Sequence, residues 1–213
     1  TNPPFGGMEE DGIENNFPAT VRTKETADLF LVLIMHLLKD GGRGAIVLPD
    51  GTLFGEGVKT RIKEELLTQC NLHTIVRLPN GVFAPYTGIK TNLLFFTKGE
   101  PTREIWYYEH PYPPGVKSYN KTKPIHISEF DAEKKWWGRA GQASKRKETE
   151  LAWRVPIEQI KASGYNLDIK NPNVVDPGHA DPDKLLLEYQ QLVKAVNDTR
   201  EKLKRELQAA LER

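Results

Sequence analysis

The tetrapeptide Asn2-Pro3-Pro4-Phe5 has the residue types that can hold and activate an exocyclic amine. Two consecutive prolines restrict φ, so they hold the Asn2 side-chain amide and the Pro3 carbonyl in a rigid arc. Such an arc can accept both hydrogens of an amino group, which frees the nitrogen lone pair for in-line attack on an activated methyl group. The adjacent ring of Phe5 offers a face on which a planar base can stack. A polyproline turn without chemical function is the alternative interpretation.

The elements that must position this tetrapeptide alternate between helix and strand, which predicts an α/β sheet with parallel neighbours and crossover connections. A mostly apolar helix is expected over Lys24–Asp40. Apolar residues on all sides of Leu29–Leu38 predict that it is buried against a sheet, with His36 as a core residue. An amphipathic helix is expected over Lys59–Gln69. Short apolar runs predict strands at Ala45–Leu48, His73–Pro79, Thr91–Gly99 and, at the sheet edge, Ile105–Tyr108.

The second half of the chain is more polar. Pro111, Pro113, Pro114 and Gly115 predict an exposed loop, and residues 116–150 show little periodicity. Residues 151–163 predict a short strand followed by a helix that starts at Pro156. Asn171–Pro182 has the composition of a linker. Apolar residues then recur every three or four positions over Asp183–Arg213, which predicts a long amphipathic helix with a coiled-coil-like stripe.

The composition excludes several classes of site. The chain has 213 residues with 30 Lys and Arg against 29 Asp and Glu, so the net charge of +1 indicates no particular partner. Cys70 is the single cysteine, which excludes an internal disulfide framework and a cysteine-based zinc site. The five histidines have no metal-ligand spacing, so no metal site is predicted, and no Ser-His-Asp arrangement is evident. The run Leu29–Leu38 is too short to span a membrane, and a cytoplasmic protein is predicted.

The order of the segments from NPPF onwards resembles the amino-methyltransferases that act on adenine N6 and use S-adenosylmethionine. In those enzymes an aromatic-bearing loop leads into an antiparallel last strand, which corresponds here to Thr91–Gly99. The phrases LPDGTLF, NGVFAPYTGIKTNLLFFTKG and SGYNLDIKNPN, with the WWGR and AWRV segments, are similar to the methylation (modification) subunit of type I restriction-modification systems. The resemblance covers nearly the whole chain. It implies the C-terminal half of a Rossmann-like S-adenosylmethionine-dependent methyltransferase sheet, followed by an irregular segment and a long C-terminal helix.

Residue roles follow from this resemblance at the matching positions. Asn2 and the Pro3 carbonyl would hold the adenine amine, with Pro4 completing the motif, and Phe5 would stack on the extruded base. Phe83 lies in the loop whose aromatic residue stacks on the other face of the base in this family. The alternative for Phe83 is a core residue entering a strand. Three other residues of the loop are expected to line the pocket or to meet phosphate, or else to be solvated: Tyr86, Thr87 and Lys90.

The glycine-rich turn that binds S-adenosylmethionine in this family lies before the NPPF motif, where this sequence has only Thr1. Gly42-Arg43-Gly44 has the wrong polarity for such a turn, and Gly55-Glu56-Gly57 has no partner acid at the right distance. We therefore expect a C-terminal fragment in which Asn2 supplies only part of the cofactor site. Such a fragment is expected to be inactive alone and to expose an apolar face and a strand edge, which favour self-association.

A basic segment, KKWWGRAGQASKRK, occupies residues 134–147. Its cations are candidates for contact with DNA phosphates: Lys134, Lys135, Arg139, Lys145, Arg146 and Lys147. The alternative is a solvated loop that Trp136 and Trp137 anchor to the body of the protein. The terminal helix, in turn, either folds back on its own domain or docks on a partner. In the family it resembles, that partner is the specificity subunit, within a complex that holds a second modification subunit and a restriction subunit.

Taken together, the sequence predicts an S-adenosylmethionine-dependent DNA adenine-N6 methyltransferase of a type I system. Three parts are expected: half of the catalytic domain (residues 1–110), an extension with a linker (111–182) and an assembly helix (183–213). One alternative keeps NPPF but changes the acceptor to a protein glutamine or an RNA base. Another is a module without enzymatic activity that binds the specificity subunit.

Overall fold

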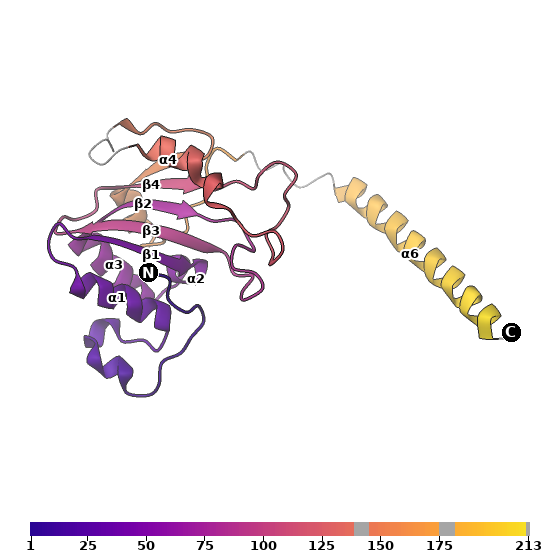
Figure 1. Ribbon diagram of the computed structural model, residues 1–213, viewed down its shortest axis with the longest axis horizontal. Helices are drawn as coiled ribbons and strands as arrows, with labels where there is room; N and C mark the ends of the chain where they lie inside the picture. The colour runs from indigo at the N-terminus through magenta and orange to yellow at the C-terminus, as the bar shows by residue number, and fades with distance from the viewer. Residues whose placement is uncertain (139–144, 175–181, 212–213) are drawn as a thin grey trace. The chain divides into compact units, whose positions relative to one another are not determined.

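The computed structural model describes residues 1–138, 145–174 and 182–211, which form two compact units, Thr1–Asn173 and Val174–Arg213. The first unit is built on a five-stranded sheet (Figure 1). Its strands, in spatial order, are β1 (Arg43–Pro49), β3 (Thr91–Lys98), β2 (Cys70–Arg77), β4 (Glu104–Glu109) and β5 (Ala152–Pro156). The second unit contains a single long helix, α6 (Pro182–Leu211).

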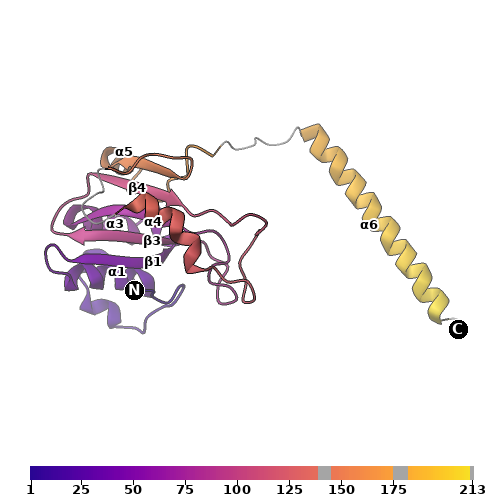
Figure 2. The same ribbon diagram turned by 45° about the horizontal axis from the view of Figure 1, so that its top comes forward.

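Helices cover both faces of the sheet (Figures 1 and 2). One face carries α1 (Thr26–Leu37), α2 (Asp50–Phe54) and α3 (Val58–Gln69), and the same hydrophobic cluster includes residues of α5 (Ile157–Ala162). The other face carries α4 (Asp131–Trp137) over a smaller cluster. Short 3-10 turns complete the described unit: Ile13–Asn16, Ala19–Val21 and Ile127–Phe130.

The expectation of parallel neighbours, drawn from the alternation of helix and strand, was wrong for most of the sheet, whereas the antiparallel strand implied by the resemblance is present as β3. β3 pairs antiparallel with both β1 and β2, and β5 pairs antiparallel with β4. The residues between β2 and β3 contain no helix, so the chain turns back beside β2 instead of crossing over to run parallel. Only β2 and β4 are parallel neighbours, because β4 reverses direction again after β3.

The expectation that Ile105–Tyr108 forms an edge strand was also wrong. These residues belong to β4, which lies between β2 and β5, and all four side chains are buried. The ring of Trp153 in β5 stacks on Tyr107, with 5.3 Å between ring centroids. Four consecutive large apolar residues are typical of a strand that is buried on both faces, which is where the structure places them.

Helix α1 is buried against the sheet, as predicted, but it packs there with one face only. Leu31, Val32 and Met35 are buried, whereas Leu37 is 72% exposed. His36 was predicted to be a core residue, and it lies on the exposed side with its Nδ1 atom 2.9 Å from the Val32 carbonyl oxygen. The helix period of 3.6 residues carries both Leu37 and His36 away from the sheet.

A buried carboxylate joins the three helices that follow the NPPF segment. The Asp28 side chain in α1 is fully buried and accepts hydrogen bonds from the Thr52 hydroxyl in α2 at 2.9 Å and from Lys59 Nζ in α3 at 2.5 Å. The backbone amide of Thr26 donates to the Gly7 carbonyl at 3.0 Å. The start of α1 is therefore tied both to α2 and α3 and to the chain just after NPPF. No helix among the described residues is long and apolar enough to cross a membrane.

Gly44 in β1 lies directly opposite Phe96 in β3, and a Cβ atom at position 44 would come within 2.4 Å of the Phe96 ring. We expect Gly44→Ala to lower the free energy of unfolding by about 1–3 kcal/mol, because the aromatic ring is held inside the core and cannot move away freely. Urea denaturation of the chain measures this loss. Gly51→Ala in α2 is the control, since a Cβ there meets nothing within 4 Å, and equal denaturation midpoints for the two variants would contradict the expectation.

Candidate functional site

Thr1 lies along the free side of β1 and directs Asn2 to the end of that strand. The Thr1 nitrogen donates to the Ala45 carbonyl at 2.7 Å, and the Val47 amide donates to the Thr1 carbonyl at 3.1 Å. Bonds to the residues on either side of Ile46 have the pattern of a parallel strand pair. Asn2 therefore leaves the sheet at the carboxyl end of β1, the edge at which open α/β sheets bind ligands.

The polar groups predicted to hold an amine are available in this structure. Asn2 is exposed, and neither its side chain nor the Pro3 carbonyl has a hydrogen-bond partner among the described residues. Pro3 itself is buried, which fixes the start of the turn against the sheet. Two unpaired acceptors on a rigid backbone can receive two hydrogens from a ligand.

The loop of residues 78–90 brings Phe83 against Phe5. The two ring centroids are 5.3 Å apart and the ring planes meet at 78°, an edge-to-face contact. Residues 5 and 83 are far apart in sequence, and both rings are partly buried. The predicted pair of aromatic residues is therefore assembled, with the rings touching each other.

The two ends of this loop are held at the same sheet edge. At its start, the Leu78 amide donates to the Thr91 carbonyl at 3.0 Å; at its end, the Asp50 amide donates to the Lys90 carbonyl at 3.0 Å. The Asn92 side-chain amide donates to the Asp50 carboxylate at 2.6 Å and so ties β3 to the end of β1. Sequence reasoning missed Asp50 and Asn92. The signal for this pair in the sequence was an asparagine within an apolar run. In the structure Asn92 is nearly fully buried.

The other loop residues lie in different environments. The Tyr86 side chain is 93% exposed and has no ring contact among the described residues. The Thr87 hydroxyl accepts a hydrogen bond from the Ile89 amide at 3.1 Å, within the loop itself. Lys90 is partly buried, and its side chain has no partner among the described residues. The structure thus brings Phe83 to Phe5 and leaves Tyr86 in solvent.

The predicted basic segment is anchored by its tryptophans, as the solvated-loop alternative expected. Trp137 meets the Phe95 ring edge-on at 4.8 Å, and the Trp136 indole nitrogen donates to the Lys147 carbonyl at 2.9 Å. Lys135, Lys145 and Lys147 are exposed. Lys134 is exposed as well and pairs with Asp131 at 2.9 Å, and Arg139 lies outside the described residues.

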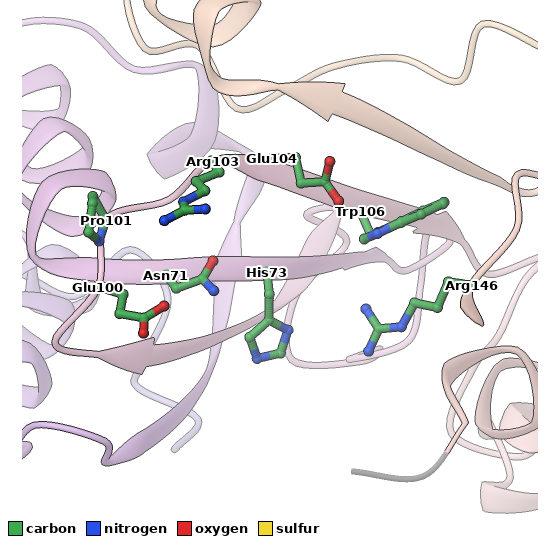
Figure 3. Close-up of a pocket in the computed structure, with 8 residues that line it drawn as sticks. All are labelled: Asn71, His73, Glu100, Pro101, Arg103, Glu104, Trp106 and Arg146. Carbon is green, nitrogen blue, oxygen red and sulfur yellow. The ribbon is translucent and has the colours of Figure 1, made fainter. Parts of the chain in front are cut away.

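Arg146 is the member of this segment that is buried. Its Nη1 atom donates to the Thr74 hydroxyl at 2.8 Å, and its guanidinium lies 4.5 Å from the centre of the Trp137 ring. The cation therefore has aromatic faces and a hydroxyl as its neighbours, an arrangement that stabilises a desolvated guanidinium. It lines a hollow of about 450 Å³ that also contains His73, Arg103 and Glu104 (Figure 3). This hollow lies at the amino ends of β2 and β4, opposite the end that carries Phe83.

His73 is the bulged residue of β2, where the pairing with β3 shifts between Leu72 and Thr74. Burial, together with the nearby Arg146 cation, lowers the pKa of His73 to about 4. The unfolded chain binds a proton at this residue below its ordinary pKa of about 6.5, whereas the folded chain does so only near 4. Stability from His73 is therefore present above pH 6.5 and is lost as the pH falls from 6.5 to 4.

We expect His73→Gln to flatten the loss of stability between pH 6.5 and 4. Urea midpoints measured at several pH values within this window test the change in slope. His126→Gln is the control, because that histidine is exposed and we expect its variant to keep the slope of the parent. Parallel pH profiles for the parent and His73→Gln would contradict the assignment.

In each glycine pair considered as a cofactor cradle at least one glycine is closely packed, although a Cβ at Gly57 would meet nothing within 4 Å. A Cβ at Gly55 would come within 2.1 Å of the Lys59 side chain, and Gly44 faces Phe96 as described above. Both glycines therefore permit close packing inside the fold. The described residues also contain no cluster of three or more His, Cys, Asp or Glu side chains arranged to hold a metal ion.

The profile of the N-6 DNA methylase family matches residues 1–178 of the chain. The type I restriction enzyme EcoEI methylase subunit of Escherichia coli is 62% identical over 212 residues, which cover 99% of this chain and 43% of that protein. The crystal structure of a modification subunit of a putative type I restriction enzyme from Vibrio vulnificus YJ016 is 50% identical, with a TM-score of 0.76 over 84% of this chain and 39% of that one.

A third relative is a chain from a structural study of complex assembly and conformational transition in a type I R-M system. It is 40% identical, with a TM-score of 0.77 over 98% of this chain and 44% of that one. The chain therefore spans less than half the length of each of these relatives, and the matched part includes the NPPF segment and the loop of residues 78–90.

Proposed function

The chain belongs to the N-6 DNA methylase family, and on that premise we propose that it forms part of an enzyme that methylates adenine N6 in DNA. The observation that carries this proposal is the pair of free acceptors, Asn2 and the Pro3 carbonyl, next to the contact between Phe5 and Phe83. Similarity to type I methylase subunits supports the narrower proposal of a modification subunit of a type I restriction-modification system.

In the proposed reaction the chain binds and orients an extruded adenine. The Asn2 side-chain oxygen and the Pro3 carbonyl oxygen accept the two N6 hydrogens, which draws the amine toward tetrahedral geometry and frees its lone pair. Phe5 and Phe83 hold the two faces of the base, so that the amine has one direction of attack. S-adenosylmethionine, when bound, supplies an electrophilic methyl group. After transfer, the amine loses one proton to water.

The residues present fit one side of such a methyl donor. Asn2 is exposed at the carboxyl end of β1, where its backbone and side chain are accessible to both donor and acceptor. Gly44 and Gly55, considered above as parts of a cofactor cradle, are closely packed instead. We therefore propose that Asn2 is the part of the cofactor site that this chain contributes.

A base can enter between Phe5 and Phe83 only if the two rings separate. The centroids are 5.3 Å apart, whereas a planar group in contact with a ring on each side needs about 7 Å between them. The turn that carries Phe83 is closed by short-range bonds, Ala84 to Gly81 at 3.0 Å and Tyr86 to Phe83 at 2.9 Å. These bonds keep the shape of the turn when the two rings separate.

Helix α6 is proposed to bind partner subunits. Exposed apolar residues follow one side of it: Leu185, Tyr189, Leu192, Val196, Leu203 and Leu207. A stripe of this kind is stabilised by packing against other helices. We propose the specificity subunit as that partner, in a cytoplasmic complex with a second modification subunit and a restriction subunit. We retain three parts for the chain, residues 1–110, 111–182 and 183–213. Self-association of the isolated chain through its apolar surfaces is part of the same proposal.

Two alternatives differ in substrate or class. An acceptor in RNA or a protein glutamine would use the same Asn2 and Pro3 geometry. A module without enzymatic activity would use α6 alone. The relatives named as type I restriction enzyme subunits favour DNA. Exposed Lys135, Lys145 and Lys147 remain candidates for DNA phosphates.

The role of Asn2 is tested in a hybrid subunit, in which this chain replaces the matching segment of the EcoEI methylase subunit. With the specificity subunit present, we expect labelled methyl to pass from S-adenosylmethionine to adenine N6 in duplex DNA. Asn2→Ala should lower this rate by about 10²–10³-fold, because one of two acceptors for the reacting amine is removed. Asn15→Ala, at another exposed asparagine, should leave the rate unchanged.

The acceptor is identified in the same assay. Label in RNA or protein, with DNA unlabelled, would overturn the DNA assignment and keep the amine-holding role of Asn2. Equal rates for Asn2→Ala and the parent hybrid would overturn that role.

The apolar stripe of α6 is tested with two pairs of substitutions that add the same charge. Leu192→Glu with Val196→Glu places two carboxylates in the stripe, whereas Gln190→Glu with Asn197→Glu places them on the flank of the helix, about 110–130° around from the stripe. We expect the stripe pair to abolish co-purification of the specificity subunit with the hybrid subunit and the control pair to retain it. Retention by both pairs would contradict the assembly role.

A further inference from the structure

Two adjacent loops at the Phe83 edge of the sheet carry positive charge without acidic residues. Residues 78–90 and 111–128 together contain four lysines and no Asp or Glu, in a chain whose basic and acidic residues nearly balance. Figures 1 and 2 both show the two loops side by side at the same edge of the sheet. Three of the four lysines belong to the second loop, at positions 117, 121 and 123.

The second loop contacts the first one directly, behind Phe83. The Tyr112 hydroxyl donates to the Asn80 carbonyl at 2.8 Å. Gly81, with a φ of 80°, lies so close to the backbone of Tyr119 that a Cβ atom would come within 2.8 Å of the Tyr119 carbonyl oxygen. The rings of Tyr112 and Tyr119 also touch, with 5.4 Å between centroids. The position of the second loop is therefore tied to that of the Phe83 turn.

The second loop is anchored at its far end as well. Tyr119 is only 4% exposed, and its hydroxyl donates to the Glu129 carboxylate. Just before the loop, His110 is buried with its Nδ1 atom 2.7 Å from Glu133 of α4, and its ring stacks on Phe130 at 4.5 Å. These contacts fix both ends of the loop to the body of the first unit.

The lysines lie on a defined turn and are exposed. Asn120 closes the turn through its side-chain oxygen, which accepts hydrogen bonds from the Thr122 amide at 3.0 Å and the Lys123 amide at 2.9 Å. Lys117, Lys121 and Lys123 are all exposed and have no hydrogen-bond or ion-pair partner among the described residues. Three free ammonium groups on an anchored turn can neutralise phosphates at low cost in conformational entropy.

From these contacts we infer that the segment Tyr112–Lys123, the lysine turn, binds the DNA backbone beside the base held at Phe5 and Phe83. The inference rests on the proposed function and extends it to a surface that the basic run of residues 134–147 does not include. Extrusion of a base leaves its flanking phosphates at the mouth of the pocket. The contacts of Tyr112 and Tyr119 with the first loop place the lysine turn at that mouth.

The salt dependence of DNA binding tests the inference. The hybrid subunit with its specificity subunit is titrated with duplex DNA at several salt concentrations, without a methyl donor and in the Asn2→Ala background. We expect the triple variant K117Q/K121Q/K123Q to make the negative slope of log K against log salt less steep by about 2–3. Each lost phosphate contact removes about 0.9 from the magnitude of that slope.

The matched control is K39Q/R43Q/K161Q, which removes three exposed cations that lie outside both basic segments. We expect the control to keep the parent slope. An unchanged slope for the lysine turn variant, or an equal loss for both variants, would overturn the inference. Binding is measured without catalysis, so a failure of methyl transfer to DNA would contradict the proposed function and still leave the slopes interpretable.

Discussion

Strand β3 runs between β1 and β2 in the opposite direction to both, so its first residues lie beside the last residues of its two neighbours. The loop that leaves β2 must therefore return to the end of β1. There the Asp50 amide donates to the Lys90 carbonyl, and the Asp50 carboxylate accepts a hydrogen bond from the Asn92 side chain. Thr1 pairs on the other side of β1 and delivers Asn2 to this same edge. The antiparallel return of one strand thus brings two distant segments, each with a phenylalanine, into contact.

Burial in the first unit is divided unequally between the two faces of the sheet. The face with α1, α2 and α3 holds the larger apolar core, together with the Asp28 carboxylate that joins the three helices. The face with α4 is packed by Trp136, Trp137 and their aromatic neighbours. Phe83 belongs to the cluster on this second face, so the loop that carries it is attached to an aromatic layer.

The strands were predictable from the sequence because each is a short apolar run, and burial of such runs is a local property. Their order and direction did not follow from the apolar runs, because they depend on which loop contains a helix and on pairing across the sheet. The antiparallel direction of β3 followed only from the resemblance. The run from Ile105 to Tyr108 shows the difference. Its burial could be predicted from its apolar residues, but its position between two other strands of the sheet could not. Trp153 and Tyr107 meet only after β5 has joined the sheet.

The candidate site was predictable only in part, for a related reason. Asn2 and Phe5 are adjacent in a motif, and Phe83 followed from the resemblance of its loop. Tyr112 and Tyr119 were missed because they contact backbone groups of the first loop, which no side-chain pattern encodes. Arg146 was grouped with exposed lysines, yet Thr74 and the tryptophan rings surround it.

Under the proposed function, the contact between Phe5 and Phe83 would make base binding an exchange of partners. The edge of one ring already covers a face of the other, so an entering group would gain only the difference between two new stacked contacts and the one it displaces. A purine, with its larger ring surface, would recover more of that difference than a single small ring. Binding would therefore be graded by the size of the planar surface offered, before any hydrogen bond to Asn2 is made.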